Sequence, residues 1–196
     1  VKDAREIEKA TTFYGQGMTV NSVQLVMGMA AIANGGKLMR PYVVKAIKDQ
    51  RGKVVKENSP QVVRKVMSPE TSKKVVQILE SVVKEKGGTG SLAAIRGYRV
   101  AGKTGTSQKV DPVTKRYSPR NYVTLFVGFA PVENPRLAIL VLVDEPEAKK
   151  YGGLVAAPTF REIGAWSLNH LRVLPDVRMV RAEEGVESGN SRNNGS

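Results

Sequence analysis

The chain has 196 residues, a formal net charge of +13, 41% hydrophobic residues and 25% charged residues. This composition is typical of one folded domain and excludes a disordered chain. The absence of cysteine excludes disulfide bonds, a thiol nucleophile and a cysteine-ligated zinc site.

The N-terminal stretch VKDAREIEKATTFYG has the pattern of neither a signal peptide nor a membrane anchor. It also lacks an initiator methionine, so we expect the chain to be a fragment of a larger protein. Residues 19–33 predict a helix that is apolar nearly all round and therefore buried, with Thr19 as its N-cap. The Asn-Gly-Gly run at 34–36 predicts its end.

Residues 42–56 predict a β-hairpin with its turn at residues 49–52. Residues 69–86 predict a second helix, with Ser68 as N-cap and Pro69 at the first helical position. The two glycines that follow this segment predict its end.

Three strand-like runs follow, at 97–108, 121–130 and 137–144. They are joined without intervening helices, which favours an antiparallel meander. The third run is apolar on both faces, so we expect it to lie in the centre of the sheet with both sides covered. The 13-residue stretch at 109–121 is long for a hairpin loop, and we expect it to border a substrate groove.

A last helix is predicted at about 157–172 and should pack on this sheet. The side chains expected to face the core are Phe160, Ile163, Trp166 or Ser167, and Leu171. The remaining residues, 176–196, are polar and rich in Gly, Asn and Ser, which predicts a disordered tail. The expected fold class is α+β, an antiparallel β-sheet with helices packed on it, in which 1–175 form part of a larger domain.

A polar stretch, Lys103-Thr104-Gly105-Thr106, ends the first of the three strands. Alternation places both threonines on the same face as Val100, so the strand should begin in the core and end at a groove. Gly105 has no Cβ and allows a backbone or a ligand to approach closely. Two hydroxyls and an ammonium suit a carboxylate, and a free strand edge can pair with an extended peptide. We therefore predict a carboxylate- or peptide-binding edge strand; the alternative is an exposed polar strand end.

The stretch YRVAGKTGTSQ resembles the third motif of class B penicillin-binding proteins. The resemblance extends over segments 14–44, 85–106, 121–146 and 152–175, and is strongest to the division and elongation D,D-transpeptidases of bacterial cell-wall synthesis. It implies a partial penicillin-binding transpeptidase fold, of the serine β-lactamase type. It also implies that the parent protein cross-links peptidoglycan stem peptides by serine acyl transfer and binds penicillin.

The resemblance also implies roles for single residues. Lys103 joins the hydrogen-bond and charge network around the nucleophile. Thr104 and Thr106 bind the carboxylate of the D-Ala-D-Ala stem peptide or of a β-lactam, and Gly105 and Ser107 complete this substrate-binding set. The backbone N–H of Thr106 is one of two oxyanion-hole donors. No metal or cofactor is implied.

The family places its Ser-x-x-Lys and Ser-x-Asn motifs well before the helix at 19–33, so we expect the nucleophile to precede residue 1. The isolated chain should then be inactive. The resemblance further implies that the parent is anchored in the bacterial inner membrane, with this domain on the periplasmic side among other proteins of the cell-wall synthesis machinery.

The chain contains one Ser-x-x-Lys, from Ser81 to Lys84, but the apolar stripe of that helix lies elsewhere, so we expect Ser81 to face solvent. The Gly-rich run at 87–90 lacks a Walker lysine, and we interpret it as a helix stop and loop, which lies near the active site in the family. His170, the single histidine, is expected to pack or be solvated at a helix end, and the acidic residues at 144–147 are expected to form a solvated turn.

Two other functions stay open. One is a non-catalytic β-lactam sensor or transpeptidase-like scaffold, which a Ser-x-x-Lys motif upstream in the parent would argue against. The other is a basic nucleic-acid-binding protein, for which steeply salt-dependent binding is the test. Because the basic residues are scattered and form no arginine-rich arm, we expect no nucleic-acid partner.

Overall fold

The computed structural model describes residues 19–147 and 151–176, so all of the expected tail except Asp176 lies outside the described residues. The described helices and strands, in chain order, are α2 (Ser22–Ala33), β1 (Lys37–Met39), β2 (Ala46–Lys48), β3 (Val54–Glu57), β4 (Val62–Lys65), α3 (Pro69–Lys84), the short 3₁₀ helix η1 (Ser91–Ala93), β5 (Ala101–Val110), β6 (Tyr117–Ala130), β7 (Leu137–Asp144) and α4 (Gly152–His170).

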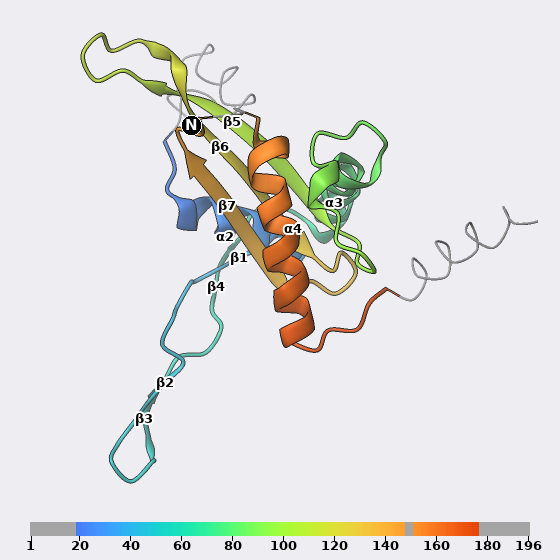
Figure 1. Ribbon diagram of the computed structural model, residues 1–196. Coiled ribbons are helices and arrows are strands. Elements are labelled where there is room, and N and C mark those ends of the chain that lie inside the picture. Colours follow the sequence, from blue (N-terminus) through green and yellow to red (C-terminus); the bar gives the residue numbers. More distant parts are fainter. Residues whose placement is uncertain (1–18, 148–150, 177–196) are drawn as a thin grey trace, which may run out of the picture.

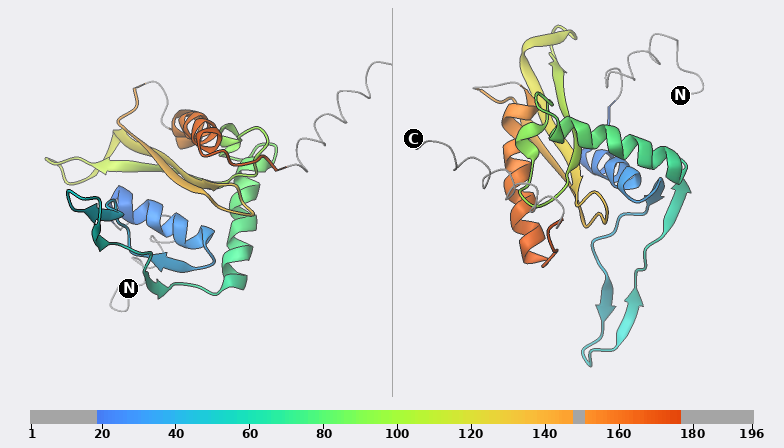
Figure 2. Two further views of the ribbon diagram at one scale, coloured as in Figure 1. Left: turned by 90° about the horizontal axis from the view of Figure 1, so that it is seen from below. Right: turned by 90° about the vertical axis from the view of Figure 1, so that its right-hand side faces the viewer.

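Strands β5, β6 and β7 form an antiparallel sheet with β6 in the middle. Helix α4 packs on one face of this sheet and α2 on the other (Figure 2). The expected α+β architecture is therefore confirmed. The prediction that 137–144 lies in the centre is wrong, because β7 is an edge strand of the described sheet. It is apolar on both faces because α2 and α4 both cover it, which needs no second neighbouring strand.

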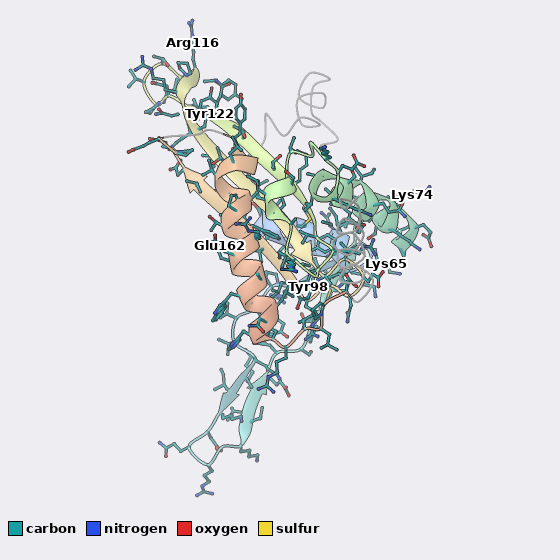
Figure 3. All side chains as sticks on the ribbon, turned by 45° about the vertical axis from the view of Figure 1, so that its right-hand side comes forward. Lys65, Lys74, Tyr98, Arg116, Tyr122 and Glu162 are labelled. Atoms are coloured by element: carbon teal, nitrogen blue, oxygen red, sulfur yellow. The ribbon has the colours of Figure 1, made fainter. Side chains whose placement is uncertain are left out.

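The hairpin between β5 and β6 is longer than the sequence indicated (Figure 1). Strand β5 continues to Val110 and β6 begins at Tyr117, so the stretch expected as a 13-residue loop is mostly strand. Asp111 holds the short turn, because its Oδ1 accepts two backbone N–H groups of the turn at 2.8 Å each. Arg116 lies at the tip, away from the body of the molecule (Figure 3).

Strand β5 begins at Ala101, four residues later than expected. The residues just before it form a tight loop, closed by an isolated bridge between Ile95 and Tyr98. The Tyr98 hydroxyl donates to the carbonyl of Val173 at 2.6 Å, which ties this loop to the segment after α4 (Figure 3). The lead-in to β5 is therefore held by this side-chain bond and by backbone bonds from the Val132 N–H to the Arg99 carbonyl and from the Asp176 N–H to the Gly97 carbonyl.

Helix α3 begins as predicted, with Pro69 first and Ser68 accepting a hydrogen bond from the backbone N–H of Thr71. The N-cap of α2 is Asn21 and not Thr19. The side chains of Asn21 and Gln24 each accept the other's backbone N–H, at 2.8 and 3.0 Å. This reciprocal capping box needs an amide or carboxylate three residues after the cap, which Thr19 lacks.

Residues 37–66 form an arm that projects from the body of the molecule (Figure 1). Strands β1 and β4 pair at its base, and β2 and β3 pair at its tip. The predicted hairpin with its turn at 49–52 is confirmed, and Asp49 closes the turn by accepting two backbone N–H groups at 2.9 Å. Strands β2 and β3 contact only each other among the described elements, so both of their faces meet solvent.

The core lies between α4 and the sheet, where Phe126 and Phe160 meet edge to face with ring centroids 4.7 Å apart. Of the side chains predicted to face this core, Phe160 is buried and Ser167, the alternative to Trp166, is half-buried. The prediction is wrong for Ile163, Trp166 and Leu171, because all three are exposed. The buried face of α4 consists of Ala156, Ala157, Phe160, Gly164 and Leu168. The small residues Ala156, Ala157 and Gly164 on this face allow α4 to lie close to the sheet, whereas the apolar periodicity favours large side chains.

A smaller cluster on the opposite face contains Met29 of α2, Ala101, Val127 and Phe129. The prediction that α2 is buried all round is not met among the described residues. Only Met29 and Ala31 of this helix are buried, and Val23 is 56% exposed.

Candidate active site

The polar stretch lies on β5, which is an edge strand of the described sheet. The register pairs Thr104 with Phe126 and Thr106 with Thr124 on β6. Directly opposed residues share a face, so both threonines lie on the α4 face, as alternation predicted. Lys103, Gly105 and Ser107 therefore lie on the opposite face, the side of the sheet on which α2 packs.

The Thr106 side chain meets the N-terminus of α4. The backbone N–H of Gly152 donates to Thr106 Oγ1 at 3.4 Å. A Cβ at Gly152 would overlap the carbonyl of Leu125 and would lie 2.7 Å from that of Gly105, so only glycine allows the helix to come this close. Tyr151, the N-cap, makes no side-chain capping bond. The partly positive helix end therefore lies beside the threonine hydroxyls, where it favours an anion.

The second threonine hydroxyl is paired with the loop after α3. Thr104 Oγ1 donates to Thr89 Oγ1 at 3.2 Å. Thr89 belongs to the Gly-rich run that was expected to end a helix and form a loop, and α3 does end before it, at Lys84. This loop thus lies against β5 at the carboxylate-binding position that the sequence predicted.

Lys103 is exposed, and its Nζ donates to the main-chain carbonyl of Thr104 at 3.0 Å. The ammonium therefore reaches the backbone of the threonine, although its side chain starts from the other face. Gly105 lies against Leu125, because a Cβ there would be 2.9 Å from the Leu125 side chain. Ser107, the last residue of the predicted substrate-binding set, is exposed on the α2 face.

An ion-pair cluster that the sequence analysis missed holds the start of β5. The guanidinium of Arg99 donates to Glu80 Oε1 at 2.7 Å and Oε2 at 2.6 Å, and to Glu133 at 2.8 Å. The Glu80 bonds raise the pKa of Arg99, and the same bonds hold the pKa of Glu80 below its usual range. The sequence signal for this cluster is Glu80, which lies beside the apolar stripe of α3, three residues before the buried Val83.

A buried hydroxyl lies directly opposite Thr106. Thr124 is fully buried, and its Oγ1 has no hydrogen-bond partner among the residues that the structure describes. Its position on β6 places it on the same face as Thr106. On the α4 face of the sheet, the apolar side chains near the start of β5 are therefore followed by hydroxyl side chains farther along the strand.

The other candidate residues contact partners other than these hydroxyls. Ser81 is half-buried, and its Oγ donates to the Ile78 carbonyl of its own helix at 2.9 Å. His170 stacks on Trp166 at the end of α4. The acidic turn after β7 is exposed. It is ion-paired with Lys109, whose Nζ lies 3.1 Å from Asp144 Oδ1 and 2.7 Å from Glu145 Oε1.

Residues 19–147 and 151–176 contain neither a metal-binding cluster nor a helix able to cross a membrane. No group of three or more His, Cys, Asp or Glu side chains in these ranges could hold a metal ion. Within the same ranges, no helix combines the length and the apolar character needed to cross a membrane.

Comparisons with known proteins place the chain in a family. A family model described as the penicillin binding protein transpeptidase domain matches residues 1–165. The chain is 45% identical over 176 residues to stage V sporulation protein D of Bacillus subtilis, covering 89% of this chain and 27% of that protein. It is 37% identical over 172 residues to the probable peptidoglycan D,D-transpeptidase PenA of Neisseria flavescens, covering 87% of this chain and 40% of that protein.

Solved structures give the same result. The transpeptidase domain of Burkholderia pseudomallei penicillin-binding protein 3 matches with a TM-score of 0.72 at 39% identity, over 89% of this chain and 50% of that one. Penicillin-binding protein 3 of Mycobacterium tuberculosis, complexed with ampicillin, matches with a TM-score of 0.73 at 33% identity, over 82% of this chain and 37% of that one. The chain thus spans between about a quarter and a half of each of these relatives. It belongs to the penicillin-binding protein transpeptidase family.

Proposed function

We propose that this chain forms the part of a peptidoglycan D,D-transpeptidase that carries the substrate-binding edge strand, and that preceding residues of the parent protein supply the serine nucleophile. The observation that carries this proposal is the meeting of three groups at one edge of the sheet. These groups are the hydroxyls of Thr104 and Thr106, the ammonium of Lys103 and the N-terminus of α4.

The arrangement suits the terminal carboxylate of a D-Ala-D-Ala stem peptide or the carboxylate of a β-lactam. Thr106 Oγ1 already accepts the Gly152 N–H, so its own proton is free to be donated to the carboxylate. Lys103 adds a positive charge beside the same edge, which strengthens hydrogen bonds to an anion. The main chain of β5 can pair with the extended stem peptide, and we place Gly105 and Ser107 in that binding strand.

The reaction follows the chemistry of serine acyl transfer. The serine oxygen bonds to the carbonyl carbon of the penultimate D-Ala, the peptide bond breaks, and the terminal D-Ala leaves as an amine that has gained a proton. The amine of a second stem peptide then attacks the ester, and the serine recovers its proton. The backbone N–H of Thr106 stabilises the oxyanion of each tetrahedral intermediate, and loss of such a donor typically lowers the rate by ~10²–10³.

The nucleophile is assigned outside this chain because Ser81, the only serine followed three residues later by lysine, donates its hydroxyl proton to a carbonyl of its own helix. We further propose that the parent is anchored in the bacterial inner membrane, acts on its periplasmic side and works with other cell-wall synthesis proteins. The β-lactam and D-Ala-D-Ala ligands follow from the same assignment, and the site needs no metal or cofactor.

The test is labelling with a fluorescent penicillin, read by gel and by intact mass. Two proteins are compared: this chain, and the chain extended at its N-terminus to the length of its relatives. We expect the extended protein alone to gain the mass of one penicillin. Acylation of this chain by itself would show that the nucleophile lies within it, and peptide mapping would identify the serine. If neither protein is labelled, the chain belongs to a non-catalytic scaffold and the proposal is wrong.

A further inference from the structure

Thr89 is the one residue with a side chain in the Gly-Gly-Thr-Gly run at 87–90, which is separated from Lys84, the last residue of α3, by Glu85 and Lys86. A Cβ at Gly88 would overlap the carbonyl of Val82, and a Cβ at Gly90 would lie 2.8 Å from the ring of Phe126. The Gly90 N–H also donates to the Val82 carbonyl at 3.0 Å. The loop is therefore fixed against α3 and the core on both sides of Thr89.

Helix α4 holds the loop from the other side. A Cβ at Gly153 would overlap the Thr89 carbonyl and would lie 3.5 Å from Cγ2 of Thr104. The absence of a side chain at Gly153 thus brings the first turn of α4, the loop and β5 together. As a result, the Thr89 hydroxyl is 3.2 Å from that of Thr104, and it is exposed on the same side of the sheet.

We propose that Thr89 is a positioning residue for carboxylate binding and acts through Thr104, an inference that rests on the proposed function. In the structure the Thr104 proton is directed to Thr89. When a substrate carboxylate arrives, Thr104 turns its proton to the carboxylate, and Thr89 then donates its own proton to Thr104 Oγ1. A hydroxyl can accept and donate at once, and a chain of such bonds strengthens each member.

The test uses the complete transpeptidase that carries this chain, with Thr89→Val, Thr89→Ser and, as a matched control, Thr159→Val at an exposed position of α4. Acylation rates over a range of benzylpenicillin concentrations separate the dissociation constant of the initial complex from the rate constant of acylation. The same measurement with penicillin methyl ester reports on a substrate without the free carboxylate.

We expect Thr89→Val to weaken the initial benzylpenicillin complex by about 3- to 10-fold, the worth of one hydrogen bond. The acylation rate constant and the methyl ester kinetics should stay at their wild-type values. Thr89→Ser keeps the hydroxyl and should restore binding, and Thr159→Val should behave as wild type. In a Thr104→Val background, Thr89→Val should cause no further loss, because the two residues act through one contact.

An equal loss with the methyl ester, or a loss that persists in the Thr104→Val background, would overturn the inference, as would wild-type binding by Thr89→Val. A thermal unfolding scan of each variant separates a folding defect from a binding defect, and Thr89→Ser provides the test if the valine variant does not fold. If the wild-type enzyme is not acylated at all, the proposed function fails and the inference fails with it. Normal wild-type acylation with unchanged Thr89→Val kinetics overturns the inference alone.

Discussion

Arg99 joins three segments of the chain at the start of β5. Its side chain binds Glu80 of α3, and its backbone N–H donates to Asp176 at 3.3 Å. Glu80 is almost fully buried, so breaking this pair leaves a charge with poor access to water. The cluster therefore sets the position from which β5 runs toward Thr104.

Glu80 also makes stability depend on pH. Its pKa is lower in the folded protein because Arg99 donates to the carboxylate. The folded state therefore binds fewer protons, and this stabilisation is present above the unfolded pKa of about 4.3 and is lost as the pH falls through the folded value. Glu80→Gln should cost about 2 kcal/mol at pH 7, and its difference from wild type should shrink below about pH 4.

Urea unfolding of the complete transpeptidase domain between pH 7 and pH 3 measures this effect. Glu162→Gln is the control, because Glu162 is exposed on α4 and its pair with Arg161 is long at 3.8 Å. The control should stay within about 0.5 kcal/mol of wild type. A Glu80→Gln deficit that is the same at every pH would contradict this account.

Substitution by alanine should lower the stability of the fold at Gly152 and raise it at Gly28. An alanine Cβ at Gly152 overlaps the Leu125 carbonyl, so α4 must move away from β5. We expect Gly152→Ala to cost about 1–3 kcal/mol and to slow penicillin acylation. Gly28, inside α2, has no atom within 4 Å of a built Cβ, and alanine there should stabilise by about 0.5–1 kcal/mol. Melting temperatures and acylation rates check both, and a neutral Gly152→Ala would show that the close approach is not needed.

Helix α4 packs on the sheet with one face, and the opposite face is exposed. Leu168 is fully buried, whereas Trp166 is 69% exposed and stacks on His170. Leu168→Ala should therefore destabilise the domain by about 2–5 kcal/mol, and Trp166→Ala by less than about 1 kcal/mol. Chemical denaturation of the two variants is the measurement. A larger loss at Trp166 would mean that this face of α4 is covered in the complete protein.

The elements themselves could be predicted from the sequence, and their details could not. Caps and glycines identified α3 and the hairpin of the arm, because these signals act within a few residues. The prediction of the core face of α4 was wrong because this face contains the small residues Ala156, Ala157 and Gly164. Periodicity arguments give more weight to large side chains. The order of strands was wrong for β7 because burial on both faces does not specify the number of neighbours. The Lys-Thr-Gly-Thr stretch lies on a strand as predicted, although β5 continues beyond it to Val110. Its partners Thr89 and Gly152 come from distant segments that alternation along one strand cannot bring together.

The described part of the chain leaves much apolar surface uncovered. Helix α2 is apolar along most of its length, yet its Val23 is about half exposed, as is Val20 just before the helix. Ile78 of α3 and Leu92 of η1 are also exposed. Apolar surface of this kind is typical of an interaction site or of a missing neighbour. This agrees with the proposal that preceding residues complete the domain.

The chain by itself should therefore associate and bind a hydrophobic dye, whereas the N-terminally extended protein should remain monomeric with little dye fluorescence. Light scattering and dye titration at equal concentrations compare the two. The net charge of +13 opposes association, so the contrast should be sharper at moderate salt than at low salt. A monomeric chain that does not bind the dye would argue against a missing neighbour.

The arm at 37–66 has a consequence for how this domain can be altered. Its tip strands touch no other described element, and its ends lie side by side in the β1–β4 pair. A change in the length of the tip therefore transmits no strain to the β5 edge. A fluorescent domain or an affinity tag spliced into the turn at residues 49–52 would report where the protein is in the cell while leaving its chemistry intact.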